Sequence, residues 1–306
     1  MGGTPLLTQN GNRWVGTGHN AVLTDYSGQQ WIVYHAVDRT DPYYANNVGY
    51  TKRPALIDPL DWRNGWPVVR GGRGPSDTGQ PGPAAQPGER SAYRPTFARD
   101  PRPGRVVTAL SDDFKGKTLS SQWTWVRPPA ASTYAVSRGA LSWQTQDADL
   151  HPPVTPLASV LTEPAPSGDY VVEAKVAVSV PANGCCQNYV QGGVMIYGGD
   201  GHYVKLASVS IEDTRQTEFG LENAPPATGY PDYGNTVAGP VGSWTYLRIV
   251  HTGATHYTAY TSVDGRNWDH GGTWTASLSA PRIGLVSMGG AGFTSRFAYV
   301  RVSALS

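Results

Sequence analysis

GTGHNAVLTDYSGQQWIVYHAVD, residues 16–38, decides how the first part of this chain folds. Strand-forming residues fill the runs WVGTGHNAVLTD and QQWIVYHAVD, and the intervening DYSGQ contains a glycine and has the length of a hairpin loop. Two more runs of strand composition follow before residue 70, RPALIDPLDW and GWPVV. These segments predict one antiparallel sheet.

The composition indicates a β protein with two modules. The chain has 306 residues, and single hydrophobic cores usually stop growing at roughly 250–300 residues. Its 37 Gly, 25 Pro, 10 Trp and 17 Tyr are typical of a turn-rich, aromatic-rich β protein. Charged residues make up 15% and the formal net charge is +1, so we expect no nucleic-acid partner.

The sequence contains no membrane or export signal. No run of about 18 apolar residues is present, which excludes a transmembrane helix and predicts no membrane partner. MGGTPLLTQNGNRW, the first 14 residues, has neither a charged nor an apolar signal region, so we expect no signal peptide in this sequence. That leaves a cytosolic protein, or a secreted protein whose start is missing.

Two adjacent cysteines, Cys185 and Cys186, indicate little about the cellular compartment. Neighbouring Cα atoms lie about 3.8 Å apart, below the usual disulfide range that begins near 4.4 Å. Two buried thiols on a turn are therefore favoured over a strained vicinal disulfide.

The composition changes near residue 71. Residues 71–105 are dense in Pro and Gly and have no hydrophobic period, which predicts a linker or an extended wrapping segment. Strand-like runs then follow at short intervals to the end of the chain, and they predict a two-sheet antiparallel sandwich of jelly-roll type. In YVVEAKVAVSV, residues 170–180, alternation places four residues on one face: Val172, Ala174, Val176 and Val178. Asp264-Gly265 is a strong hairpin signal.

Ordered motifs in both parts carry a family resemblance. GxGHN, YHAxD, RPxLID and NGWP occur in this order between residues 16 and 67. Together they resemble the last blade of the five-bladed β-propeller in glycoside hydrolase family 43, most closely the variants that act on arabinan and other arabinose- or xylose-containing polysaccharides. Farther along, the runs NYVQGGVMIYGGDGHYVKLASVSI, WTYLRI, YTAYTSVDGRNW and RIGLVSMGG are similar to the concanavalin-like C-terminal sandwich of these enzymes.

The resemblance gives an all-β fold class with a partial propeller and a concanavalin-like jelly-roll sandwich. We expect residues 1–75 to form the incomplete last blade, residues 76–106 the Pro/Gly-rich linker, and residues 107–306 the sandwich. Such a blade would expose an apolar patch made of Trp14, Trp31, Val33, Leu56 and Ile57. We expect the chain to associate through this incomplete blade.

The implied chemistry is inverting glycoside hydrolysis, with one carboxylate as base, one carboxylic acid as proton donor and a further aspartate that tunes the acid. In the family these groups come from earlier blades, so we expect no catalytic residue in this chain. The first glutamate is Glu89, within the expected linker. Asp25 lies near Gly28, and Asp58 and Asp61 flank Pro59, where turn or capping roles are usual.

His19, the histidine of GxGHN, is the candidate metal residue. In the family this histidine lines the axial channel and helps to hold a calcium ion together with waters, and the resemblance assigns that role to His19. Calcium prefers oxygen ligands, so His19 would be a minor ligand. The alternative, favoured for this chain by itself, is a histidine hydrogen-bonded to backbone beside a glycine turn.

The sandwich has its own candidate residues. Glu212 and Glu218, if on one strand, would lie roughly 20 Å apart, too far for a glycosidase pair. We expect Glu218 to pair with Arg215 instead. GGDGH, residues 198–202, reads as a hairpin turn rather than a calcium site.

Sugar binding is the alternative role for the sandwich, because aromatic faces stack on sugar rings and polar side chains bind hydroxyls. The candidate carbohydrate-binding residues are Tyr189, Gln191, Tyr203, Lys205, Trp268 and Trp274. Trp and Tyr also fill sandwich cores, as we expect for Trp123, Trp125 and Trp143.

Three functions remain open. The chain is part of a secreted hydrolase for plant cell-wall polysaccharide or oligosaccharide and is inactive alone, or a carbohydrate-binding module, or a structural support for a propeller.

Overall fold

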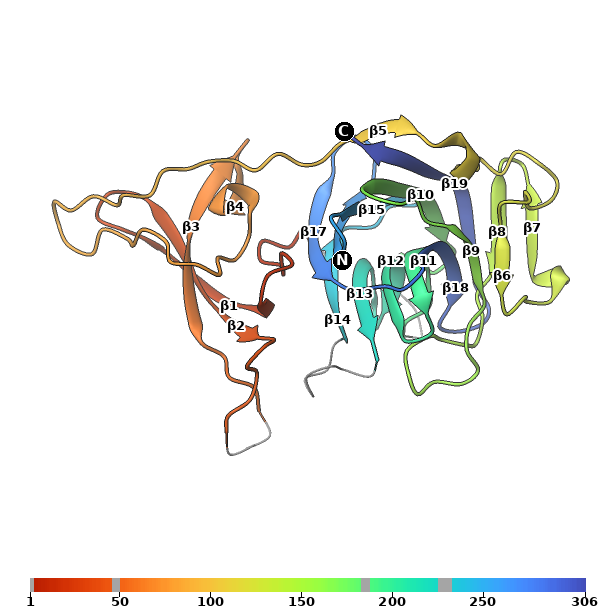
Figure 1. Ribbon diagram of the computed structural model, residues 1–306, viewed down its shortest axis with the longest axis horizontal. Helices are drawn as coiled ribbons and strands as arrows, with labels where there is room; N and C mark the ends of the chain where they lie inside the picture. The colour runs from red at the N-terminus through yellow and green to blue at the C-terminus, as the bar shows by residue number, and fades with distance from the viewer. Residues whose placement is uncertain (1–2, 46–49, 183–187, 225–232) are drawn as a thin grey trace. The chain divides into compact units, whose positions relative to one another are not determined.

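The computed structural model describes residues 3–45, 50–182, 188–224 and 233–306, and it is all-β, as predicted (Figure 1). The chain divides into two compact units, Leu6–Asp100 and Met1–Pro5 with Pro101–Ser306. Three short 3-10 turns interrupt the strands: η1 (Arg70–Gly72), η2 (Thr108–Leu110) and η3 (Ala131–Thr133). No helix in the described ranges is long and apolar enough to cross a membrane.

The first unit is built on the predicted antiparallel sheet. Its strands follow one another in space in chain order: β1 (Trp14–Thr24), β2 (Gln30–Asp38), β3 (Ala55–Arg63) and β4 (Trp66–Val69). The turn between β1 and β2 is closed by the Gly28 N–H, which donates to the Asp25 carbonyl at 3.0 Å. Gly28 has a φ of 88°, which glycine adopts without strain.

Asp25 ties the Pro/Gly-rich segment to this sheet. Its Oδ2 accepts hydrogen bonds from the Ala84 backbone N–H at 3.0 Å and from the Trp31 indole at 2.9 Å. Its Oδ1 caps the turn by accepting from Ser27 and Gln29. Burial by itself would raise the pKa of Asp25, but these hydrogen bonds outweigh it and hold the pKa well below its usual range.

The apolar patch expected on the first unit is wrong for its two tryptophans. Trp14 and Trp31 are buried, at 9% and 1% exposure, rather than open to solvent. Leu6 and Leu7 pack against the cluster that contains Trp14, and the Tyr93 ring lies 6.0 Å from the Trp31 ring. Of the five expected residues, Ile57 is exposed, while Val33 and Leu56 are half-buried. Other large apolar side chains are exposed in this unit: Val22, Leu23, Tyr26, Trp62 and Trp66.

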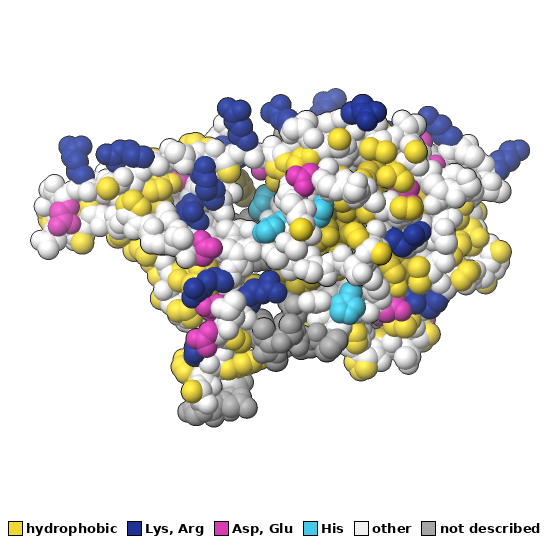
Figure 2. Space-filling model, viewed as in Figure 1, with side chains coloured by type: hydrophobic (Ala, Val, Ile, Leu, Met, Phe, Trp, Pro, Cys, Tyr) yellow, Lys and Arg dark blue, Asp and Glu magenta, His cyan; other side chains and the backbone are white. Residues whose placement is uncertain are grey.

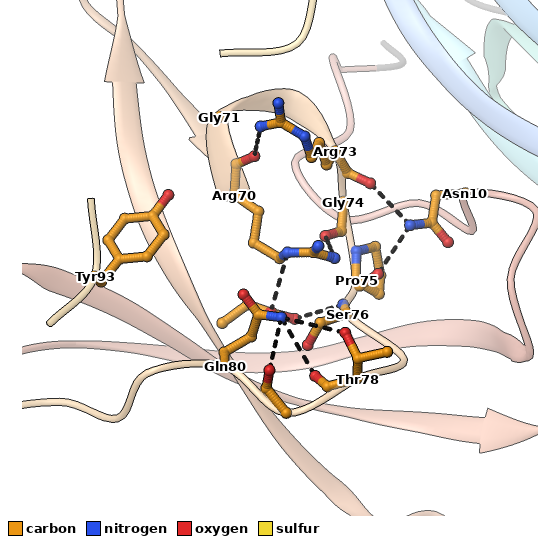
Figure 3. Close-up of polar contacts among 12 residues, drawn as sticks. Asn10, Arg70, Gly71, Arg73, Gly74, Pro75, Ser76, Thr78, Gln80 and Tyr93 are labelled. Carbon is orange, nitrogen blue, oxygen red and sulfur yellow. Dashed lines mark hydrogen bonds and ion pairs between the residues drawn. The ribbon is translucent and has the colours of Figure 1, made fainter. Parts of the chain in front are cut away.

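Asp58 anchors the beginning of the same segment from inside a strand, not from a turn as expected. It lies in β3, fully buried, and its Oδ2 accepts from the Tyr34 hydroxyl at 2.6 Å and from the Ser76 N–H at 3.0 Å. The Arg70 Nε atom lies 3.8 Å from Asp58 Oδ1. Arg70 and Ser76 lie close together because both contact the Asp58 carboxylate (Figure 3).

Asp61, also inside β3 and buried, fixes the later part of the segment. Its Oδ2 accepts from the Gly71 N–H and from the Tyr93 hydroxyl, both at 2.6 Å. Gly71 has a φ of 62°, and a Cβ at this position would lie 2.1 Å from the Thr96 carbonyl oxygen. Only glycine fits there, because the segment that contains Thr96 passes directly over it.

The second unit is the predicted two-sheet sandwich. One sheet has the order β17-β16-β15-β10-β19-β8-β7, with β5 paired to β19, and the other has the order β14-β13-β12-β11-β18-β9-β6. The strands of the first sheet are β5 (Pro103–Val106), β7 (Tyr134–Ser137), β8 (Ala140–Gln144), β10 (Tyr170–Val178), β15 (Thr245–Thr252), β16 (His256–Ser262), β17 (Asp269–Thr275) and β19 (Thr294–Leu305). Those of the second sheet are β6 (Thr124–Val126), β9 (Val160–Pro164), β11 (Gln191–Gly199), β12 (His202–Ile211), β13 (Thr214–Asn223), β14 (Tyr233–Gly239) and β18 (Arg282–Met288).

Alternation along β10 places its apolar residues in the core between the sheets, as predicted. Val172, Ala174 and Val176 are fully buried and Val178 is nearly so. A Cβ added to Gly192 of β11 would meet Ser295 and Val178 of the other sheet, so the two sheets pack closely at this point. Trp123 and Trp143 are buried, as expected, and Trp125 is half-buried.

Glu163 of β9 is a buried carboxyl on the core side of its sheet. It pairs in register with Ile283 and is fully buried, and its Oε2 accepts from the Gln122 amide at 2.9 Å. Burial raises the pKa of Glu163 to about 8, and the nearby Asp112 carboxylate adds to this, whereas Gln122 and Arg282 act against it. The group is therefore neutral over most of the acidic and neutral range.

Replacing Gly71 with Ala should loosen the Pro/Gly-rich segment, because the new Cβ overlaps the Thr96 carbonyl. We expect a loss of about 1–3 kcal/mol in unfolding free energy and faster protease cleavage within residues 77–100. The matched control is Gly79→Ala, since nothing lies within 4 Å of a Cβ at that position. Equal cleavage rates for the two variants would contradict the packing.

Glu163→Gln should stabilise the sandwich as the pH rises. A carboxyl whose folded pKa lies near 8, above its unfolded value near 4.5, contributes stability that is present at low pH and is lost as the pH rises toward 8. Glutamine cannot ionise, so at about pH 8.5 we expect the variant to exceed the parent by more than about 1 kcal/mol in unfolding free energy. Denaturant unfolding across pH checks this, and a gain that does not change with pH would refute the raised pKa.

Candidate functional site

His19 lies on β1 of the first unit, exposed, with a φ of 52°. Its ring centroid is 5.6 Å from that of His35, whose Nδ1 is 2.7 Å from the Arg53 carbonyl oxygen. Among the described residues, no group of three or more His, Cys, Asp or Glu could hold a metal ion. The side chains around His19 do not fit calcium by themselves, so the calcium role stays a prediction.

The richest polar site lies on the outward face of the second sheet of the sandwich. Tyr203 and Lys205 of β12 are on this face, next to two glutamates of β13. In register, Tyr203 is opposite Glu222, Lys205 is opposite Gly220, and Ala207 is opposite Glu218. All four polar side chains are almost completely buried. We call Lys205, Glu218, Glu222, Asn235 and His151 the outer polar cluster.

Gly220 makes room at the centre of this cluster. It lies between Glu218 and Glu222 along β13, and is opposite Lys205 on one side and Asn235 on the other. A Cβ at Gly220 would be 2.6 Å from the Asn235 amide. With its nitrogen turned toward oxygen atoms, that amide donates to Glu218 Oε1 at 3.2 Å.

The two glutamates have different environments. Burial raises the pKa of Glu218, the Lys205 ammonium acts against this, and the Asp149 carboxylate adds to it. Glu222 Oε2 is 2.6 Å from Nδ1 of His151, which is half-exposed. The partner of the Glu218 carboxyl is therefore a lysine within the sheet, Lys205, and the partner of the Glu222 carboxyl is a loop side chain, His151.

That loop, residues 145–158, covers part of the face. Leu150 and Ala158 are fully buried in a cluster with Tyr197, Tyr203 and Met195. Asp149 Oδ1 accepts from the backbone N–H groups of Leu150 and His151, which positions His151 over Glu222. At the rim, the exposed Tyr233 ring lies 5.4 Å from the His151 ring.

The predicted sugar-binding residues fall in four places. Gln191, Tyr203 and Lys205 share the outward face just described. Gln191 is the first residue of β11, at the opposite end of that strand from Tyr203. Tyr189, half-exposed, precedes β11, and its carbonyl accepts from the Gln191 amide at 3.0 Å.

The two tryptophans lie elsewhere. Trp274 is between the sheets, buried, with its indole donating to the Phe219 carbonyl at 3.0 Å, and a Cβ on Gly234 would lie 2.9 Å from its ring. Trp268 lies against the first sheet, over Arg248.

Sequence reasoning did not single out His151, Tyr233 or Asn235, which reach the cluster from other elements. Glu222 had a usable signal, because positions 218 and 222 share a face of any strand that contains both.

Glu212 is not on the strand of Glu218, since β12 ends at Ile211 and β13 begins at Thr214. The expected Arg215–Glu218 pair is wrong. An odd separation puts the two side chains on opposite faces, and Arg215 donates to the carbonyls of Val180 and Gly242.

The other expected turns are present. Residues 198–202 form the β11–β12 hairpin, where Asp200 accepts two hydrogen bonds from Arg127 and one from the Tyr197 hydroxyl. Asp264 and Gly265 lie between the paired strands β16 and β17. Cys185 and Cys186 lie outside the described residues.

The outer polar cluster is suited to hydrogen bonding rather than to hydrolysis. Four residues along β13 place the Cα atoms of Glu218 and Glu222 about 13 Å apart, whereas glycosidase carboxyl pairs stand about 5–9.5 Å apart. Asn235 occupies the space between them, and Lys205 lies opposite the same residue, Gly220. The arrangement offers charged and amide groups beside an exposed aromatic ring.

Comparisons with known proteins match both units. Residues 2–67 match the model of glycosyl hydrolases family 43, and residues 111–294 match the model of the β-xylosidase C-terminal concanavalin A-like domain. No curated protein sequence matches the chain.

Solved structures share the fold at low identity. The family 43 protein BlXynB from Bacillus licheniformis is 21% identical with a TM-score of 0.54, and the match covers 98% of this chain and 56% of that one. Xylan β-1,4-xylosidase from Bacillus halodurans C-125 is 18% identical with a TM-score of 0.51 and the same coverage. A bifunctional GH43-CE protein from Bacteroides eggerthii is 15% identical with a TM-score of 0.54, covering 94% of this chain and 34% of that one. The chain thus spans little more than half the length of the first two.

Lys205→Met should make the sandwich lose more stability as the pH rises. Without the ammonium, the pKa of Glu218 rises further above its unfolded value, so more stability is lost as the pH increases. We expect the melting temperature of the variant to fall more between about pH 5 and pH 8 than that of the parent. The double variant Lys205→Met/Glu218→Gln should remove this extra loss, and an unchanged pH dependence in the single variant would contradict the coupling.

Proposed function

The chain belongs to the proteins of glycoside hydrolase family 43 that carry a β-xylosidase-type concanavalin A-like domain, and on this premise we propose that it is part of a glycosidase for plant polysaccharide. The substrate class proposed is arabinose- or xylose-containing cell-wall polysaccharide or oligosaccharide. The observation that carries the proposal is the presence of both family modules, in order, in one chain. The names of the solved relatives, which include a xylan β-1,4-xylosidase, support it.

We further propose that the chain alone does not hydrolyse glycosides. Inverting hydrolysis needs one free carboxylate as base and one carboxylic acid as proton donor about 6.5–9.5 Å apart. In the first unit, Asp25, Asp58 and Asp61 are buried and accept hydrogen bonds that tie down the Pro/Gly-rich segment. These aspartates are thus engaged in the fold and do not face a substrate.

The first unit has features that favour its being one blade of a propeller with a neighbouring blade beside β1. β1 is an edge strand, and its residues from His19 to Thr24 are all exposed. An open edge with exposed Val22 and Leu23 favours packing against a neighbouring sheet. We propose that this edge packs against the remaining propeller blades in the active enzyme. We also propose that His19 helps to hold a calcium ion in the complete propeller, and that the enzyme is secreted.

A second candidate function is glycan binding by the sandwich itself. The outer polar cluster places Glu222 and His151 beside the exposed Tyr233 ring. An aromatic face next to fixed hydrogen-bonding groups is the usual way in which proteins hold a sugar ring.

Hydrolysis and binding should therefore separate in the 306-residue chain. We expect no turnover of chromogenic arabinofuranoside, chromogenic xyloside or debranched arabinan, with retained binding to arabinan or xylan. Tyr233→Ala should weaken that binding about three- to tenfold, because a stacking surface is lost. Tyr26→Ala, which removes an exposed ring from the first unit, is the matched control.

Two outcomes would overturn these proposals. Turnover that is abolished by Glu218→Gln or Glu222→Gln would place an active site in the sandwich. Absence of binding to every glycan would leave the sandwich with a structural role only.

A further inference from the structure

The outward face of the first sheet of the sandwich carries cations and aromatic rings in two rows across its strands. In one row, Glu173 of β10 is opposite Arg248 of β15 and Arg301 of β19. In the next row, Lys175 of β10 is opposite Tyr246 of β15 and Tyr299 of β19. Strands lie about 4.8 Å apart, so each row is a closely spaced line of side chains perpendicular to the strands.

The cations of this face lie on its aromatic rings. The Arg248 guanidinium is 3.5 Å from the Trp268 ring centroid, and that of Arg301 is 4.0 Å from the Tyr299 centroid. Lys175 and Arg296 both lie 5.4 Å from the Trp244 ring. We call these side chains, with Tyr246, the cation–aromatic face. Stacking holds the charges in place without neutralising them.

Carboxylates compensate only part of this charge. Glu173 accepts from Arg248 at 2.7 Å and from the Tyr299 hydroxyl at 2.6 Å, and Arg301 lies 3.5 Å from the half-buried Asp113. In the described part of the chain, the face therefore has four cations and two carboxylates. Figure 2 shows Lys and Arg side chains along the upper edge of this unit, near β5 and β19.

We propose that the cation–aromatic face binds a polysaccharide that carries carboxylate groups, such as a uronic acid-substituted xylan. Fixed guanidinium and ammonium groups recognise carboxylates, and the half-buried Trp244, Tyr246 and Trp268 rings offer edges and faces to the sugar backbone. The choice of a glycan rests on the function proposed above. A polyphosphate fits less well, because the net charge of the whole chain is only +1.

The test compares binding of the 306-residue chain to glucuronic acid-substituted xylan with binding to the same polymer after its carboxyl groups are reduced to alcohols. We expect the intact polymer to bind more tightly, and the difference to shrink as salt is raised, because exposed charges are screened. Lys175→Gln/Arg301→Gln should weaken binding to the intact polymer about three- to tenfold and leave binding to the reduced polymer unchanged.

The matched control is Lys117→Gln/Arg138→Gln, which removes two exposed positive charges from other loops of the sandwich and should bind as the parent does. Circular dichroism and melting confirm that each variant is folded. Equal affinity for intact and reduced polymer, or equal loss in both double variants, would overturn the proposal. So would a polyphosphate that binds as tightly as the acidic xylan. None of these readouts requires hydrolysis, so failure here is distinct from failure of the enzymatic proposal.

Discussion

A carboxylate that leaves water must receive hydrogen bonds, a counter-charge or a proton, and this requirement organises both units of the chain. In the first unit, Asp25, Asp58 and Asp61 receive donors from Ala84, Ser76 and Tyr93, so the carboxylates hold a segment that has little apolar surface of its own. In the second unit, Glu163 is held neutral by burial, while Glu218 relies on Lys205 and Asn235, and Glu222 on His151.

Features with a local period were readable from the sequence. The alternation of Val172, Ala174 and Val176, and the turns at residues 198–202 and 264–265, depend on neighbouring residues and on the spacing of two that defines a strand. The same spacing places Glu218 on the opposite face of the strand from Arg215 and on the same face as Glu222. The sequence alone was therefore sufficient to rule out the expected ion pair.

Other features depend on contacts between distant segments, and sequence pattern does not reveal these. Trp31 is buried because a Pro/Gly-rich segment folds back over it, and that segment has no hydrophobic period that would indicate packing. His151 and Tyr233 reach the outer polar cluster from a loop and a strand that lie more than 70 residues apart in sequence. Trp274 is a core residue because Gly234 leaves room for its ring.

The two outward faces of the sandwich have different chemistry. The outward face of the second sheet carries the outer polar cluster, an almost buried group of lysine, glutamate and amide side chains with an aromatic ring at its rim. The outward face of the first sheet carries the cation–aromatic face, in which cations stack on aromatic rings.

The buried carboxyl groups of this chain hold its fold together, through the donors and the protonation described above. Carbon-13 NMR titration of the carboxyl groups in the intact chain tests this role most directly. We expect Asp25 to remain ionised well below the usual pH range and Glu163 to titrate near pH 8. Titration of both groups near their ordinary values, about 4, would contradict it.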